Sequence, residues 1–161
     1  MLYNSILFLH IFFAILWVGG VMFIGWGVFP ATKNLSGLIR QKVINNIMSH
    51  AHLPLALLGL AVITTGVLLG VWVGPINSVN SLITTNYGKR FMLAGVIGVA
   101  TLAWGTWVSY PMMKRVLADS FIWQQAEKGH ELFMNRQLFK AQFVASIEGI
   151  GFMTLLYLMV F

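Results

Sequence analysis

Apolar residues lie along this chain in four long stretches, roughly residues 5–29, 53–74, 91–111 and 141–161. A helix needs about 20 residues, at about 1.5 Å each, to cross the ~30 Å hydrocarbon layer of a membrane. Each of the four stretches meets that length. The pattern therefore predicts an all-α fold, in which residues 1–161 form one integral membrane domain built as a four-helix bundle.

Prolines and glycines refine this pattern. The first stretch ends near Pro30, and the second begins at Pro54, a residue that the first turn of a helix tolerates. The segment between them, "ATKNLSGLIRQKVINNIMSHAH", is polar with apolar residues at helical spacing, so we expect it to lie along the membrane interface. Gly66, Gly70 and Gly74 recur every four residues, which predicts close helix packing there; a cofactor lying against this stripe is the alternative.

Composition agrees with a membrane location and excludes several function classes. The chain is 58% hydrophobic and 9% charged, whereas a soluble domain is about 25% charged. Cysteine is absent, which excludes disulfides, thiolate metal sites and cysteine nucleophiles. The net charge is +6, but the basic residues flank apolar stretches and form no patch interleaved with aromatic residues. We therefore expect membrane lipid, and no nucleic acid, around this chain.

The basic residues also predict an orientation. Eight of the ten lie in or beside the first and third loops. They are Lys33, Arg40, Lys42, Lys114, Arg115, Lys128, Arg136 and Lys140. Because cytoplasmic loops carry the excess of Lys and Arg, we expect loops one and three in the cytoplasm and both termini outside.

One histidine interrupts the first apolar stretch, "NSILFLHIFFAILW". A polar ring in hydrocarbon is costly unless it has a partner, so His10 is a packing residue with a hydrogen bond, a proton carrier, or a ligand to haem iron or a metal. Its depth predicts partners near the outer ends of the other helices. These are Tyr87, Lys89, Arg90, Met92, Tyr157 and Met159.

Other polar residues lie at different depths. His50 and His52 are at the opposite boundary, about 20 Å or more from His10, and their spacing puts them on different helical faces. Glu148 is the one acid inside a stretch, about two turns from the cytoplasmic end of the fourth helix, so it must face the bundle interior to handle protons, bind a ligand or clamp helices. Its expected neighbours are Thr64, Thr65, Thr101 and Thr106, with His52 or Lys140 from nearer the boundary.

Three motifs resemble one group of membrane proteins. In "LHIFFAILWVGGVMFIGWGVFP", a Leu-His pair is followed by Trp17, Gly20 and a closing Pro30; this resembles the first helix of the copper-resistance CopD-type membrane domain and of HemJ-type protoporphyrinogen oxidases. The stretch "TTNYGKRFMLAGVIG" is similar to the Tyr-Gly-basic start of a CopD-type helix. Glu148 is similar in position to a glutamate that opens the last helix of the HemJ type.

The resemblance implies a four-helix bundle in a prokaryotic cytoplasmic (inner) membrane that binds b-type haem, with His10 as an axial ligand. Lys89 is the nearest match to the second ligand of the HemJ type; Met92, Met159 or Tyr87 is the alternative, or the position is open. Trp17, Tyr87 and Glu148 complete the expected cofactor site. A second haem at His50 or His52 is a further alternative.

Two functions are therefore expected, from different classes. The first is haem-linked electron transfer or oxidoreductase chemistry, with a quinol or a redox protein as partner. The second is copper transport or tolerance without haem, in which His10 on one side and His50, His52 and Met48 on the other are transient ligands. A structural role, as a homo-oligomer or as a subunit of a larger membrane complex, is the third alternative.

Overall fold

The computed structural model describes residues 1–160, and this part of the chain consists of helices joined by short connections, without strands. Four long helices of 30 to 36 residues are apolar enough to cross a membrane, which confirms the predicted all-α class with four spans; residue 161 of the fourth predicted span lies outside the described residues. Three of the helices contain one π-helical turn, labelled η. The segments are α1 (Leu2–Phe23), η1 (Ile24–Val28) and α2 (Phe29–Ala31); α3 (Gly37–Val67) and η2 (Leu68–Trp72); α5 (Asn86–Trp104), η3 (Gly105–Ser109) and α6 (Tyr110–Ala118); and α8 (Glu131–Val160).

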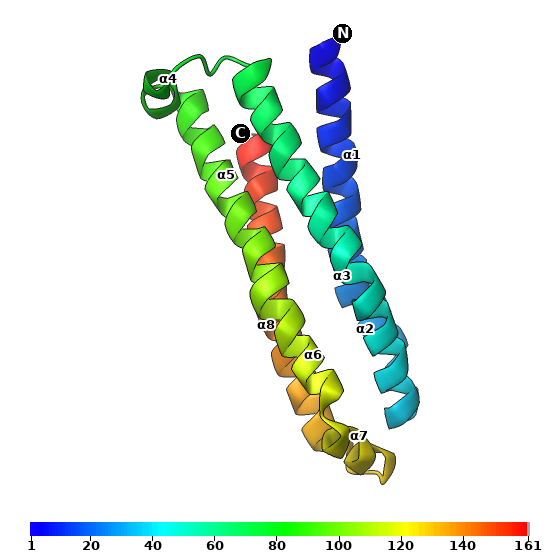
Figure 1. The fold of residues 1–161 in the computed structure, drawn as a ribbon. Coiled ribbons are helices and arrows are strands. Elements are labelled where there is room, and N and C mark those ends of the chain that lie inside the picture. Colours follow the sequence, from blue (N-terminus) through cyan, green and yellow to red (C-terminus); the bar gives the residue numbers. More distant parts are fainter. Residues whose placement is uncertain (161) are drawn as a thin grey trace.

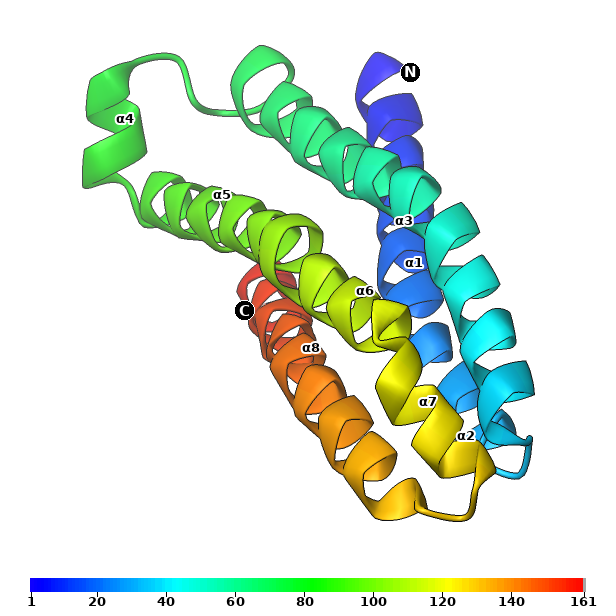
Figure 2. The ribbon, with the colours of Figure 1, turned by 60° about the horizontal axis from the view of Figure 1, so that its bottom comes forward.

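The long helices pack as two pairs, α1 with α3 and α5 with α8, and the pairs meet where α3 contacts α5. Both termini and the short helix α4 (Val79–Thr84) lie toward one end of the molecule, called here the termini end (Figure 1). Helix α2 and the short helix α7 (Ser120–Glu127) lie at the other, the α7 end (Figure 2).

Two helix starts differ from the prediction. Helix α3 begins at Gly37 and continues through Pro54, so the predicted start at Pro54 is wrong, and the segment expected to lie separately along the interface is the first half of α3. Proline removes one backbone hydrogen bond inside a helix, but the neighbouring turns on both sides continue. Helix α8 begins at Glu131, ahead of the predicted residue 141. The helices therefore extend beyond the apolar stretches toward the α7 end.

The outer surface of the bundle is apolar. Only 11 to 17% of the most apolar window of each long helix is buried inside the chain, and large side chains such as Phe8, Trp26 and Trp107 point outward. Exposing so large an apolar surface to water would be unfavourable, whereas contact with lipid is not. The chain thus has the surface and the helix lengths of a multi-pass membrane protein.

The most tightly packed core lies at the α7 end. Trp123 of α7 is fully buried, and its indole Nε1 donates a 2.9 Å hydrogen bond to the carbonyl of Val116. Eleven buried residues from α2, α3, α6, α7 and α8 form this cluster. They are Phe29, Ile44, Met113, Val116, Leu117, Ile122, Trp123, Ala126, Met134, Leu138 and Ala141.

The glycine stripe of the second helix packs against side chains. A Cβ at Gly66 would lie 3.2 Å from His10 Cε1, and one at Gly70 would overlap the ring of Phe91. Gly74 lies beyond η2, where a Cβ would meet the backbone of its own chain. Two of the three glycines therefore provide the close helix contacts that the sequence predicted.

Candidate functional site

His10 lies on the inward face of α1. Ile6 and Trp17, one turn before it and two turns after it, are both buried, at 8% and 4% exposure, and residues at this spacing share one face of a helix. His10 itself is half-buried between them. The ring of His10 therefore faces the neighbouring helices, and its hydrogen-bond partners are on α3 and differ from those predicted.

The ring of His10 is held by α3. Its Nδ1 lies 3.1 Å from the carbonyl oxygen of Val62 and 3.0 Å from Oγ1 of Thr65. The Thr65 hydroxyl can donate to the Ala61 carbonyl at 2.7 Å, so its lone pair faces the histidine. Both atoms near Nδ1 then act as acceptors, which places the proton on Nδ1 and leaves Nε2 as a free lone pair. Among the described residues, no hydrogen bond to Nε2 is formed.

The residues predicted around His10 lie on two other helices: Tyr87, Lys89, Arg90 and Met92 are on α5, and Tyr157 and Met159 are on α8. Lys89 is in the first turn of α5 with an exposed side chain. Tyr87 is also exposed, and its ring stacks on Phe91 at 6.4 Å. The hydrogen bonds of the His10 ring go to α3 instead.

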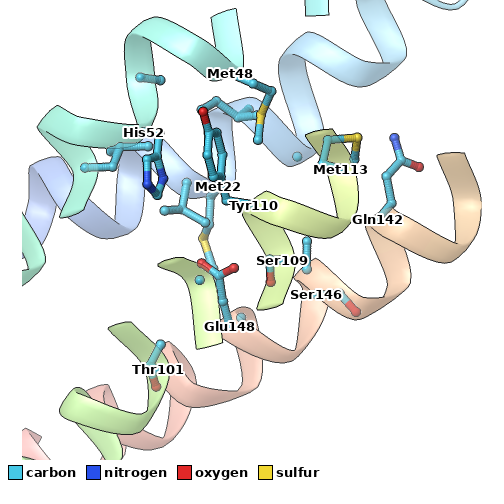
Figure 3. Close-up of a pocket in the computed structure, with 18 of the residues that line it drawn as sticks. Met22, Met48, His52, Thr101, Ser109, Tyr110, Met113, Gln142, Ser146 and Glu148 are labelled. Atoms are coloured by element: carbon cyan, nitrogen blue, oxygen red, sulfur yellow. The ribbon is translucent and has the colours of Figure 1, made fainter. Parts of the chain in front are cut away.

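A cavity of about 460 Å³ opens deeper in the bundle, between α1, α3, the α5 to α6 helix and α8. Figure 3 shows polar side chains and sulfur atoms gathered around it. The lining is largely aromatic and aliphatic. Its polar, charged and sulfur-containing members are Met22, Met48, His52, Thr101, Thr106, Ser109, Met113, Tyr110, Gln142, Ser146 and Glu148.

Glu148 is the acidic residue of this cavity. Its side chain is only 8% exposed, and its carboxylate points into the cavity from α8 (Figure 3). The carboxylate lies so close to the backbone of Gly105 that a Cβ there would be 2.9 Å from Oε2. The Ser109 hydroxyl is buried beside it without a well-formed hydrogen bond. The prediction that Glu148 faces the interior is confirmed.

Some of the expected neighbours of Glu148 share its cavity. Thr101, Thr106 and His52 line it. Thr65 instead contacts His10, and Thr64 is exposed with its hydroxyl bonded to its own helix. Because α8 begins at Glu131, Glu148 lies about 25 Å from that start at about 1.5 Å per residue, near the middle of the helix and not two turns from its end.

The two neighbouring histidines of α3 are separated, as their spacing predicted. His50 is exposed, and its Nδ1 bonds the carbonyl of Asn46 at 2.8 Å. The ring of His52 lines the cavity and stacks on Tyr110, with ring centroids 3.6 Å apart and an interplanar angle of 7°. Met22, Met48 and Met113 line the same cavity. Among residues 1–160, no group of three or more His, Cys, Asp or Glu side chains could hold a metal ion.

Two of the three π turns border the cavity. Ile24, Gly25 and Trp26 of η1 line it on one side, and Gly105, Thr106 and Ser109 of η3 line it on another. Single π turns inside α-helices occur frequently at functional sites. These segments, together with Ser109, Tyr110 and Met22, were not predicted from the sequence, because a one-residue change of helical register leaves no mark in a hydropathy pattern.

Trp17 connects the two sites. It lines the cavity, and its ring meets Phe152 of α8 edge-to-face with centroids 5.0 Å apart. It also lies seven residues after His10 on the same face of α1, which corresponds to about 10 Å along the helix. His10 is thus above the cavity, toward the termini end.

No family model, no curated protein and no solved structure matches the chain.

Proposed function

We propose that this protein binds b-type haem in a cytoplasmic membrane and acts in electron transfer or haem-linked redox chemistry, with His10 as an axial ligand. The observation that supports this is the anchored imidazole: Nδ1 faces two oxygen acceptors on α3, and Nε2 is left with its lone pair. Histidines that bind a metal characteristically donate their other ring N–H to a carbonyl or similar acceptor. The resemblance of the first helix to the CopD and HemJ types points to the same ligand.

The residues around His10 fit this role by their chemistry. The Val62 carbonyl and the Thr65 hydroxyl fix the ring orientation and the tautomer, and Gly66 allows the ring to approach α3 closely. Haem, when bound, supplies a one-electron carrier whose potential depends on its axial ligands and their hydrogen bonds. The chain itself would orient the ligand and keep water away, and a membrane quinol or a redox protein would supply the electrons.

The test is the visible spectrum of the protein purified in detergent after expression with a haem supply. We expect a Soret band and sharp α and β bands on reduction, and we expect His10→Ala to abolish or shift them. His50→Ala is the matched control, because His50 is exposed and bonds only to its own helix. A protein that stays colourless, or a spectrum that His10→Ala leaves unchanged, would contradict the assignment.

A second candidate function, copper(I) transport or tolerance, is favoured by a different observation. His52 and three methionines, Met22, Met48 and Met113, line one cavity, and thioether and imidazole groups are ligands that suit copper(I). Competition for copper(I) against a chromogenic chelator would detect this site. Loss of binding in His52→Ala, with His50→Ala unchanged, would support it, and the absence of competition by the wild-type protein would exclude it.

A further inference from the structure

We propose that the cavity around Glu148 binds a monovalent organic cation, and that the Glu148 carboxylate is its counter-ion. The site is separate from the His10 site, and its ligand class is independent of haem. A bulky quaternary phosphonium or a protonated aromatic amine represents the chemistry that we expect.

Glu148 gives the cavity one negative charge that no neighbouring side chain in residues 1–160 balances. Glu148 is buried near the middle of a membrane-spanning helix, and no Lys or Arg of the described residues lines its cavity. Neither does any described residue form an ion pair with it. An isolated carboxylate in hydrocarbon is costly, and such residues are rare unless they serve a function. The cavity therefore lacks one positive charge, which either a proton or a ligand can supply.

The lining of the cavity favours an organic cation over a metal ion or an anion. A calcium or magnesium ion needs about six or more oxygen ligands, whereas Glu148 is the only acid among residues 1–160 that lines the cavity. Anions are disfavoured because His52 is the only basic side chain that lines it in the described part of the chain. Seven aromatic side chains line it instead, and the faces of aromatic rings attract organic cations, most strongly where water is excluded. They are Trp17, Trp26, Phe29, Tyr110, Phe139, Phe143 and Phe152.

The cavity has the size and the opening that an organic cation needs. The cavity volume of about 460 Å³ lies within the range of sites that enclose drug-sized molecules, about 300 to 1,000 Å³. Three of the lining aromatics, Trp26, Phe139 and Phe143, are 77%, 67% and 65% exposed. Because the outer surface at this depth faces lipid, the cavity opens sideways into the membrane. A cation that dissolves in the bilayer can reach it.

The shape of the backbone adds an independent observation. Gly105 lies in the π turn η3, where the Glu148 carboxylate approaches its Cα, and the π turn η1 lines the cavity from α1. Beside the carboxylate, the buried Ser109 hydroxyl has no well-formed hydrogen bond. Both helices thus depart from regular α geometry at the cavity, which a purely structural helix contact does not require.

The experiment uses the full chain in detergent or lipid nanodiscs, with tetraphenylphosphonium as the probe and calorimetry or tryptophan quenching as the readout. We expect saturable binding with one site per chain. Glu148→Gln should weaken it at least tenfold, and Glu148→Asp should retain most of it. Glu131→Gln is the matched control on the same helix, since Glu131 does not line this cavity, and its affinity should equal that of the wild type.

Tetraphenylborate, an anion of similar shape, separates charge recognition from apolar partitioning on the wild-type protein alone. We expect it to bind far more weakly than the cation. Equal binding of the two ions, or an undiminished affinity in Glu148→Gln, would overturn the proposal and leave an apolar cavity that accepts neutral rings. Haem binding at His10 is measured separately by absorbance, so failure of one proposal does not decide the other.

Discussion

At the scale of single residues, two polar side chains inside the apolar helices support the proposals, His10 with its ring against α3 and Glu148 in the cavity. His10 and Glu148 both face the interior, as their cost in hydrocarbon requires. The partner of His10 is Thr65. Thr65 lies several residues before the end of the continuous helix formed by α3 and η2. Helices α1 and α3 pack along their length, so the contact is not set by the alignment of their ends. Which groups meet depends on the rotation and crossing of the helices, and these depend on packing.

Thr65→Val tests the anchoring of His10. Valine keeps the shape of threonine but removes the hydroxyl that lies 3.0 Å from Nδ1, so the imidazole loses one acceptor and would be a weaker donor to the iron of the proposed haem. With haem bound as proposed, we expect its midpoint potential to rise, as measured by spectroelectrochemical titration.

Thr64→Val is the control for this substitution, because Thr64 is exposed and its hydroxyl bonds to Leu60 of its own helix. Its potential should match that of the wild type. An equal shift in both variants would show that the change does not act through His10.

At the scale of elements, hydropathy predicted four spans, while their starts and internal irregularities came from packing. Helix α3 continues through Pro54 because the polar first half of the helix belongs to the packed cluster at the α7 end, where Arg40 and Ile44 are buried. The three π turns change the helical register by one residue, which a 20-residue window cannot detect. The cavity depends on two of these turns, and it was therefore the part of the site that sequence reasoning could not predict.

The contact between α5 and α8 gives a prediction at this scale. A Cβ at Gly151 would overlap Oγ1 of Thr101 and lie 3.1 Å from its methyl carbon, and Thr101 is β-branched and buried. We expect Gly151→Ala to destabilise the protein by about 1–3 kcal/mol, as overpacked contacts do, and to lower the unfolding temperature in detergent.

Gly149→Ala is the matched control, two residues away on the same helix, where a Cβ meets nothing within 4 Å. Its unfolding temperature should be unchanged or slightly raised, since alanine favours helix over glycine. If both variants lose the same stability, the close approach of α5 and α8 is not the cause.

At the scale of the whole molecule, the predicted orientation can be tested with unusual simplicity because the chain has no cysteine. Asn77→Cys, before α4, and Lys128→Cys, after α7, introduce single exposed thiols at opposite ends. The distribution of basic residues predicts that a membrane-impermeant maleimide labels Asn77→Cys in spheroplasts with an intact cytoplasmic membrane. It should label Lys128→Cys only after that membrane is permeabilised. The reverse labelling pattern would show that the orientation is opposite to the predicted one.

The π turns relate the cavity to the number of residues in two of the helices. A π turn closes its hydrogen bond one residue further along than an α turn, so η1 and η3 each hold one residue more than a regular helix needs. The cavity can therefore be understood as the space opened by two single-residue insertions, one in the first helix and one in the third. A relative with one residue fewer in each of these segments should have continuous α-helices, no space beside its fourth helix and no need for an acid there.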